Sequence, residues 1–159
     1  MAVVGFGKHA DVDTRRLLIQ YPDYVSWALE QDQPKPQLAA LVATLRRYIG
    51  ILNGKPFVEK CTGKIRGVKC MHPVTRGTAY SSHSGINVDL VWWCDNCNPY
   101  QLGAVASLID IRTYEDALSF VKRNGGRKLD FTEIIKDLSQ AKGMPKRVTA
   151  AALEAFFGP

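Results

Sequence analysis

Apolar side chains recur with the spacing of an α-helix between residues 38 and 52. Arg46 and Arg47 fall outside this apolar stripe, so the segment predicts an amphipathic helix with one buried face. The stretch "QDQPKPQ" before it is typical of a linker, and "NGKPF" after it is typical of a helix stop and a turn. The stripe consists of Leu38, Leu41, Val42, Leu45, Ile49 and Leu52.

The residues upstream of that helix predict a small strand–helix module. "VVGFGKHADVDTRRLLIQY" has the pattern of a short strand, a glycine turn and a helix. A second helix is expected over residues 22–31, with Pro22 at its first position, where the missing N–H costs little. We expect Tyr24 and Trp27 of this helix to pack in the core.

The last third of the chain has the pattern of a helical bundle. The apolar run 101–111 predicts one helix. Thr113 is expected to cap the next helix together with Asp116, three residues on, and that helix ends at Gly125. A third helix is expected to begin at Asp130 and to end at Gly143, and residues 144–157 predict the last one.

The middle of the chain favours β-structure. Residues 73–80 and 86–93 are rich in β-forming side chains, and "SSHSG" joins them in the manner of a hairpin loop. Alternation places Trp92 and Trp93 on opposite faces of the second strand. One tryptophan is expected to cover the core around Cys94 and Cys97, which follow this strand, and the other either packs on a neighbouring element or lies exposed, where it could stack a nucleobase.

These elements predict an α+β protein in three pieces. A strand–helix module covers residues 1–54, a β element that contains all four cysteines and resembles a zinc ribbon covers residues 55–100, and a helical region covers residues 101–159. The composition, with 46% hydrophobic and 23% charged residues, is that of an ordinary globular protein.

The chain has four cysteines, and all lie between Cys61 and Cys97. Cys94 and Cys97 have the spacing of a knuckle, in which a tight turn directs both sulfurs at one ion. Two glycines in "TGKIRGVK" allow the segment between Cys61 and Cys70 to loop out and return. Four clustered thiols in a reducing compartment favour one structural Zn²⁺ held by Cys61, Cys70, Cys94 and Cys97, similar to a zinc ribbon. His72 is an alternative ligand, and four ordinary buried cysteines are the other interpretation.

Basic residues concentrate around the first cysteine pair, in a chain whose formal net charge is +6. This distribution favours a polyanionic partner. We expect contacts to nucleic acid, either DNA or RNA, from Lys60, Lys64, Arg66, Lys69 and Arg76. Solvated surface charge is the simpler explanation of the remaining basic clusters.

The N-terminal third carries two motifs of a known family. "GFGKH", followed by a helix and "YPDYVSWALEQ", resembles a small module built on "FGK(Y/H)" and "PxYxxW" that is appended to some bacterial proofreading-type exonucleases. The resemblance covers roughly residues 3–50. It implies a nucleic-acid-processing context, but it does not imply nuclease activity, because the carboxylates of the exonuclease catalytic domain are missing.

A second resemblance points to a different class of protein. "SSHSGINVDLVWWCDNCN" partly resembles the HNH-type nucleases, which implies His83 as general base and Asn87 as the residue that orients it. The residue after Cys97 is Asn98 rather than the final histidine of that family, so we expect no enzyme activity.

We therefore expect a zinc-containing nucleic-acid-binding accessory protein that works with other proteins in a larger nucleoprotein complex. The alternatives are a structural subunit, in which the zinc and the tryptophans build a protein interface, and a degenerate HNH-like nuclease. No apolar run reaches the roughly 18 residues that span a bilayer, and the N-terminus has no signal-peptide pattern. We expect an intracellular, cytoplasmic location in a reducing compartment, with no membrane partner.

Overall fold

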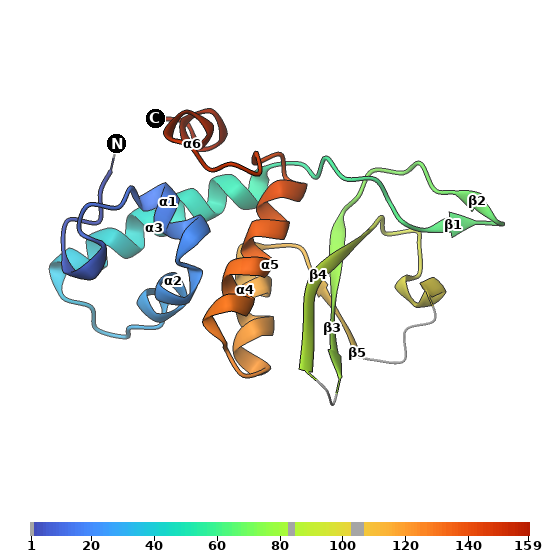
Figure 1. The fold of residues 1–159 in the computed structure, drawn as a ribbon, viewed down its shortest axis with the longest axis horizontal. Helices are drawn as coiled ribbons and strands as arrows, with labels where there is room; N and C mark the ends of the chain where they lie inside the picture. Colours follow the sequence, from blue (N-terminus) through green and yellow to red (C-terminus); the bar gives the residue numbers. More distant parts are fainter. Residues whose placement is uncertain (1, 83–84, 103–106) are drawn as a thin grey trace.

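The computed structural model describes residues 2–82, 85–102 and 107–159, and these form an elongated α+β fold (Figure 1). Helices occupy one end, a three-stranded sheet lies in the middle, and a two-stranded hairpin extends to the far end. The helices are α1 (Thr14–Gln20), α2 (Pro22–Leu29), α3 (Pro36–Gly54), α4 (Tyr114–Arg123), α5 (Lys128–Ala141) and α6 (Ala150–Phe157). The strands are β1 (Lys64–Ile65), β2 (Val68–Lys69), β3 (Arg76–Ser82), β4 (Gly85–Trp93) and β5 (Ser107–Ile111), and short 3₁₀ turns cover Gly7–His9 and Pro99–Leu102.

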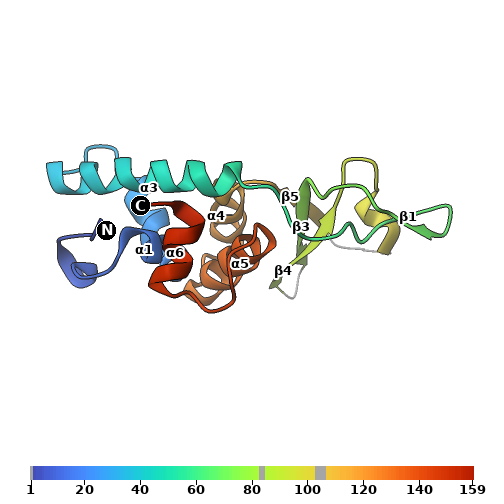
Figure 2. The same cartoon turned by 90° about the horizontal axis from the view of Figure 1, so that it is seen from above.

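Both ends of the chain contribute to one helical body. α1 packs against α3, α5 and α6, as Figure 2 shows. The buried Arg15 guanidinium pairs with Asp13 and donates a hydrogen bond to the carbonyl of Gly158 at 2.7 Å. The Tyr114 hydroxyl donates to the carbonyl of Leu18 at 2.7 Å. The helices before residue 54 and those after residue 100, which the sequence pattern assigns to separate regions, thus share one core. The β region is inserted between them in the chain.

Local signals account for most of the helix ends. α3 begins with Pro36 and buries Leu41, Leu45, Ile49 and Leu52 of the predicted apolar stripe, while Leu38 and Val42 are half-buried against the core. At α4 the Thr113 hydroxyl accepts the Asp116 N–H while the Asp116 carboxylate accepts the Thr113 N–H, which confirms the predicted capping box. α5 begins at Lys128 rather than at Asp130, which lies in its first turn. None of the described helices is both long and apolar enough to cross a bilayer.

Two predictions for the N-terminal module are wrong. In place of a strand, Val3 forms only an isolated bridge with Asp13, because the glycine turn leaves too short a segment to extend the pairing. Trp27 is 48% exposed and does not join the core. Tyr24 is half-buried, and its ring contacts those of His9 and Trp27, at 4.9 and 5.2 Å between centroids.

The sheet has the order β4-β3-β5, with β3 antiparallel to both neighbours. β3 and β4 form the predicted hairpin, in which Arg76 lies opposite Trp93. The helix predicted over residues 101–111 is wrong where the structure describes it, because Ser107–Ile111 forms β5 and Ile111 pairs with Gly77, while residues 103–106 lie outside the described residues. A short apolar run suits a strand or a helix, and here the open edge of β3 decides the outcome.

Two polar side chains at the end of α5 bond to the β region or to the segment that leads into it. The Asp137 carboxylate of α5 accepts the N–H of Leu90 on the edge strand β4 at 2.7 Å. Lys142 is only 4% exposed, and its Nζ donates to the carbonyls of Asn53 and Lys55 at 3.0 and 2.8 Å. Lys142 therefore satisfies carbonyls at the end of α3, where the chain leaves the helical body.

Both tryptophans of β4 are buried. The Trp92 ring packs against Phe57 at 5.4 Å between centroids. The Trp93 indole N–H donates to the Thr78 hydroxyl at 2.9 Å. The packing alternative therefore holds for both side chains, and neither is placed to stack a nucleobase.

Candidate metal centre

The first cysteine pair brackets a hairpin that we call the finger, residues 62–69. β1 and β2 pair antiparallel, with Lys64 opposite Lys69 and Ile65 opposite Val68. The turn between the strands has positive φ angles of 51° at Arg66 and 79° at Gly67. Positive φ at both central residues gives a two-residue hairpin turn whose twist matches that of the strands. The irregular cysteine spacing is therefore the length of one tight hairpin.

The hairpin returns the chain so that Cys70 lies beside Cys61. The Cys70 N–H donates to the carbonyl of Gly63 at 2.8 Å, which closes the base of the finger. The second pair follows β4 directly, and the Cys97 N–H donates to the carbonyl of Cys94 at 3.4 Å in a tight turn. All four cysteines are buried.

The four sulfurs have the geometry of a tetrahedral thiolate site. All lie within 4.8 Å of one another, and Cys70 Sγ is 3.7 Å from Cys94 Sγ. A tetrahedron with Zn–S bonds of about 2.3 Å has edges of about 3.8 Å. The separation is far too long for a disulfide bond, whose sulfurs lie about 2.05 Å apart. These residues fit one structural Zn²⁺, and a shell of four thiolates leaves no position for a reacting water.

Backbone N–H groups support the sulfurs as they do in metal knuckles. Cys61 Sγ accepts the N–H of Gly63 at 3.4 Å and that of Cys94 at 3.3 Å. The N–H of Asn96 bonds to Cys94, and the N–H of His72 bonds to Cys70. Hydrogen bonds from the surrounding shell stabilise the ionised form of each ligand and fix its direction.

The thiols resist ionising together unless a cation is present. Burial, followed by the neighbouring thiols, raises the pKa of Cys97 far above its usual value. Burial also opposes ionisation of Cys94, but the Asn96 N–H and the three other cysteines outweigh it and lower the pKa of Cys94. A divalent cation at the centre removes this conflict, because it favours the thiolate form of every ligand.

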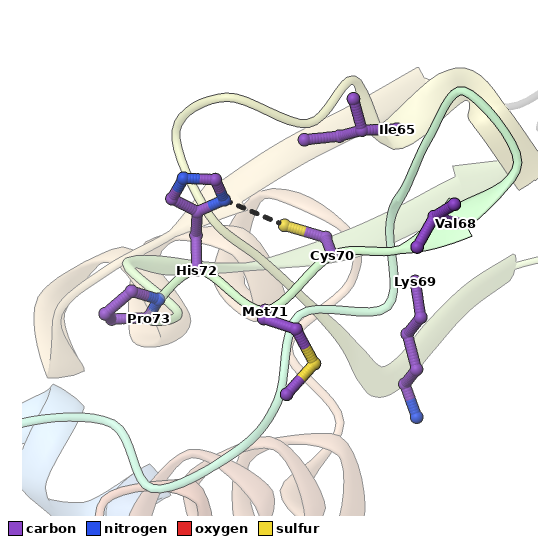
Figure 3. Close-up of a pocket in the computed structure, with 7 residues that line it drawn as sticks. All are labelled: Ile65, Val68, Lys69, Cys70, Met71, His72 and Pro73. Carbon is purple, nitrogen blue, oxygen red and sulfur yellow. Dashed lines mark hydrogen bonds between the residues drawn. The ribbon is translucent and has the colours of Figure 1, made fainter.

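His72 lies beside the cysteine cluster and does not replace a ligand. Its Nδ1 is 3.3 Å from Cys70 Sγ, and its side chain is exposed (Figure 3). It lines a shallow cavity of about 360 Å³ together with Ile65, Val68 and Met71. His72 is therefore a neighbour of one sulfur at the rim of the site.

The five residues predicted to contact nucleic acid fall into two groups, four on or beside the finger and one in β3. Lys60, Lys64, Arg66 and Lys69 are exposed, and the last three lie on the finger. Arg76 lies in β3, apart from the finger, and its contact with nucleic acid stays a prediction. Its guanidinium pairs with Asp110 of β5 at 2.8 Å and donates to the carbonyl of Cys97 at 3.0 Å, so it braces the second cysteine turn.

The residues of the nuclease interpretation are only partly described. His83 lies outside the described residues. Asn87 lies in β4, and its Oδ1 accepts the N–H of Asp89 at 2.9 Å. Asn98 accepts the N–H of Tyr100 at 3.0 Å and so shapes the 3₁₀ turn after Cys97.

Several residues that support the site were missed from the sequence. The Asp95 carboxylate accepts the Thr75 hydroxyl and the Arg112 guanidinium, each at 2.9 Å, and these hydrogen bonds, that of Arg112 first, lower the pKa of Asp95. The Gln101 amide oxygen accepts the N–H of Lys64 at 2.9 Å and thereby ties the finger to the 3₁₀ turn. Each pair joins distant segments, so no local pattern signals it.

Comparisons with protein-family models, curated proteins and solved structures found no match. The assignment of a zinc site therefore depends on the geometry of the four sulfurs. No family match supports the resemblance of the N-terminal third to the exonuclease-associated module.

Proposed function

We propose that the protein is a nucleic-acid-binding accessory factor whose zinc site presents the finger to a phosphate backbone. The observation that carries this proposal is the cross-strand pairing of Lys64 with Lys69, with Arg66 at the turn between them. Directly opposed like charges destabilise a strand pair, and a bound anion between them removes that cost. A nucleic-acid backbone supplies such anions at regular spacing.

The position of the finger supports the same proposal. It extends to the end of the molecule opposite the helical body, where a long polymer can reach it (Figure 1). Lys60 precedes the finger and adds a fourth exposed cation close to the cysteines. Because the metal closes the base of the finger, these cations sit on a fixed support and lose less freedom on binding.

The helical body supports a role within a larger complex. The N-terminal motifs that resemble the exonuclease-associated module lie in this body, at the end away from the finger. The proposal gives the zinc no catalytic role, because four thiolates complete its shell. Binding through a few phosphate contacts is weak on its own, which suits a subunit held in place by other proteins.

A salt-titrated binding assay tests the proposal. Fluorescence anisotropy with labelled single-stranded and duplex oligonucleotides should show micromolar affinity with little sequence preference. Each phosphate contact should contribute roughly 0.7 to 0.9 to the slope of log affinity against log salt. The finger variant, Lys64→Gln with Arg66→Asn and Lys69→Gln, should flatten this slope. Asn at position 66 keeps the positive φ angle of the turn.

A matched control removes three exposed cations elsewhere. The control variant, with Arg46, Arg47 and Arg123 each changed to Gln, loses the same charge from α3 and α4. It should bind oligonucleotides nearly as the parent protein does. If the finger variant and the control variant lose equal affinity, or if the parent protein binds nothing at low salt, the finger is not a nucleic-acid contact.

The opposite face of the finger favours a second candidate function, a structural interaction subunit. Ile65 and Val68 are paired across the strands, and Val68 is 70% exposed. Met71 beside them is 78% exposed. Exposed apolar side chains of this size mark protein contacts in many folds. The second role would be favoured if changing Val68→Ser and Met71→Ser removed the protein from its complex with other proteins while oligonucleotide binding stayed unchanged.

A further inference from the structure

The helical body contains a concave basic site that the finger does not explain. A cavity of about 420 Å³ lies where α1, α5 and the loop before α6 meet. Lys136, Lys146 and Arg147 line it, and none of the ion pairs found among the described residues involves them. No acidic residue belongs to the lining. We propose that this basic pocket binds a phosphate group.

The distribution of charge along α5 separates the pocket from the acids of the same helix. Lys128, Thr132 and Lys136 follow one face at helical spacing, and Lys128 Nζ lies 5.9 Å from the centre of the Tyr21 ring at the α1–α2 corner. Asp137 lies on the other side, where it accepts the N–H of Leu90 from the sheet. Glu133 lies three residues before Lys136 on the same helix, but it does not line the pocket, and no ion pair found among the described residues joins it to Lys136.

The loop that carries the other two cations is held firmly. Met144 is buried, and its N–H donates to the carbonyl of Ser139 at 2.9 Å. The Thr149 N–H donates to the carbonyl of Arg147 at 3.1 Å. Lys146 and Arg147 therefore project from a shaped turn. An Arg fork binds two phosphate oxygens at once, and lysines add charge around them.

The remaining lining suggests a ligand with an organic part. Ile19 is buried and Val148 is half-buried, so they provide an apolar floor beside the cations. The Gln20 amide adds a donor and an acceptor for a ring or a sugar. A phosphate attached to an apolar or aromatic group, in a nucleoside phosphate or at the end of a nucleic-acid strand, matches this combination.

Titration calorimetry with defined probes tests the pocket in the zinc-loaded protein. The probes are pyrophosphate, a nucleoside triphosphate, and a short oligonucleotide with or without a 5′-phosphate. The pocket variant, with Lys136, Lys146 and Arg147 each changed to Gln, alters only exposed side chains and should remain folded. It should bind pyrophosphate or the triphosphate roughly tenfold or more weakly than the parent, or lose the affinity that a 5′-phosphate adds to the oligonucleotide. The control variant at Arg46, Arg47 and Arg123 should keep the parent affinity.

The probes distinguish the sources of the phosphate and separate this site from the finger. Binding of pyrophosphate or the triphosphate supports a small ligand, and binding that requires the 5′-phosphate supports a strand end. The finger variant should keep the affinity for pyrophosphate and the triphosphate, and the gain in affinity from the 5′-phosphate, even where its overall oligonucleotide affinity falls, so failure of the finger proposal does not affect this one. Failure of every probe to bind the parent, or equal binding by the pocket and control variants, would overturn the assignment.

Discussion

A Cβ atom added to Gly63 would stand 2.4 Å from Cys97 Sγ and 2.7 Å from Cys97 Cβ. The finger and the second cysteine turn therefore approach each other through the one residue type that leaves enough room. Gly63 carries no charge and binds nothing through a side chain, yet the geometry of the four sulfurs depends on it.

The first prediction is that Gly63→Ala weakens zinc binding by roughly tenfold to a hundredfold, because Cys97 must move away from the other ligands. Competition with a chromophoric chelator measures the effect. Gly50→Ala is the matched control, since a Cβ there meets nothing within 4 Å on an exposed part of α3. It should keep the zinc affinity and raise stability by about 0.5–1 kcal/mol. Equal zinc affinity in the Gly63 and Gly50 variants would contradict the close packing.

The second prediction concerns the hydrogen bond beneath the second cysteine turn. Thr78→Val should lower the free energy of unfolding by about 1–3 kcal/mol, because the buried Trp93 indole N–H loses its acceptor. Urea unfolding followed by tryptophan fluorescence gives this value. Thr44→Val on α3 removes a hydroxyl that bonds only to a carbonyl of its own helix, and should change stability by less than about 0.5 kcal/mol. Similar losses in both variants would rule out a specific role for the Thr78 hydroxyl.

The sequence predicts the elements whose signals are local. The capping box at Thr113 and Asp116, the hairpin of β3 and β4, and the stripe of α3 each follow from neighbouring residues. The cysteine cluster is predicted for the same reason, since few physical roles gather four thiols in one region of a chain.

What the sequence does not predict depends on distant partners. Ser107–Ile111 has an apolar pattern that also suits a helix, and it becomes a strand because β3 offers it an edge. Arg76 resembles its basic neighbours in sequence, but in the structure its guanidinium pairs with Asp110 and donates a hydrogen bond to the carbonyl of Cys97. The packing of α1 against α5 and α6 likewise joins segments that are far apart in the sequence, so no local pattern predicts it.

A third prediction uses the pH dependence of stability. Burial raises the pKa of Asp137 above its ordinary value of 3.8. The folded protein then holds the proton of the Asp137 carboxyl more tightly than the unfolded chain does. The stabilisation of the folded state by this protonated carboxyl is present below pH 3.8 and is lost as the pH rises through the pKa of the folded protein. Asp137→Asn retains an oxygen for the Leu90 N–H and cannot ionise. Its stability relative to the parent should therefore increase as the pH rises from 3.8 towards neutrality.

Denaturant unfolding of both proteins across this range measures the difference. Asp32→Asn, in the exposed segment before α3, is the control for the loss of one surface carboxylate. An Asp137→Asn difference that is constant with pH, or that changes in the opposite direction, would contradict the assigned role of burial.

A fourth prediction concerns the attachment of the β region to the helical body. Lys142→Met should destabilise the protein by about 2–3 kcal/mol, because the carbonyls of Asn53 and Lys55 lose their shared donor in a buried position. Lys122→Met removes an exposed cation that pairs with Glu30, and should cost less than about 1 kcal/mol. Thermal unfolding ranks the two variants, and an equal or greater loss at Lys122 would show that the attachment does not rely on Lys142.

The central claim is that Cys61, Cys70, Cys94 and Cys97 hold one structural zinc at the base of the finger. Elemental analysis of the purified protein, compared with its Cys94→Ser variant, tests it most directly. The account predicts one zinc per chain in the parent protein, and in the variant a loss of metal with loosening of the finger and the second cysteine turn, because metal binding supplies folding free energy there. A parent protein that is free of metal and yet fully folded would contradict it.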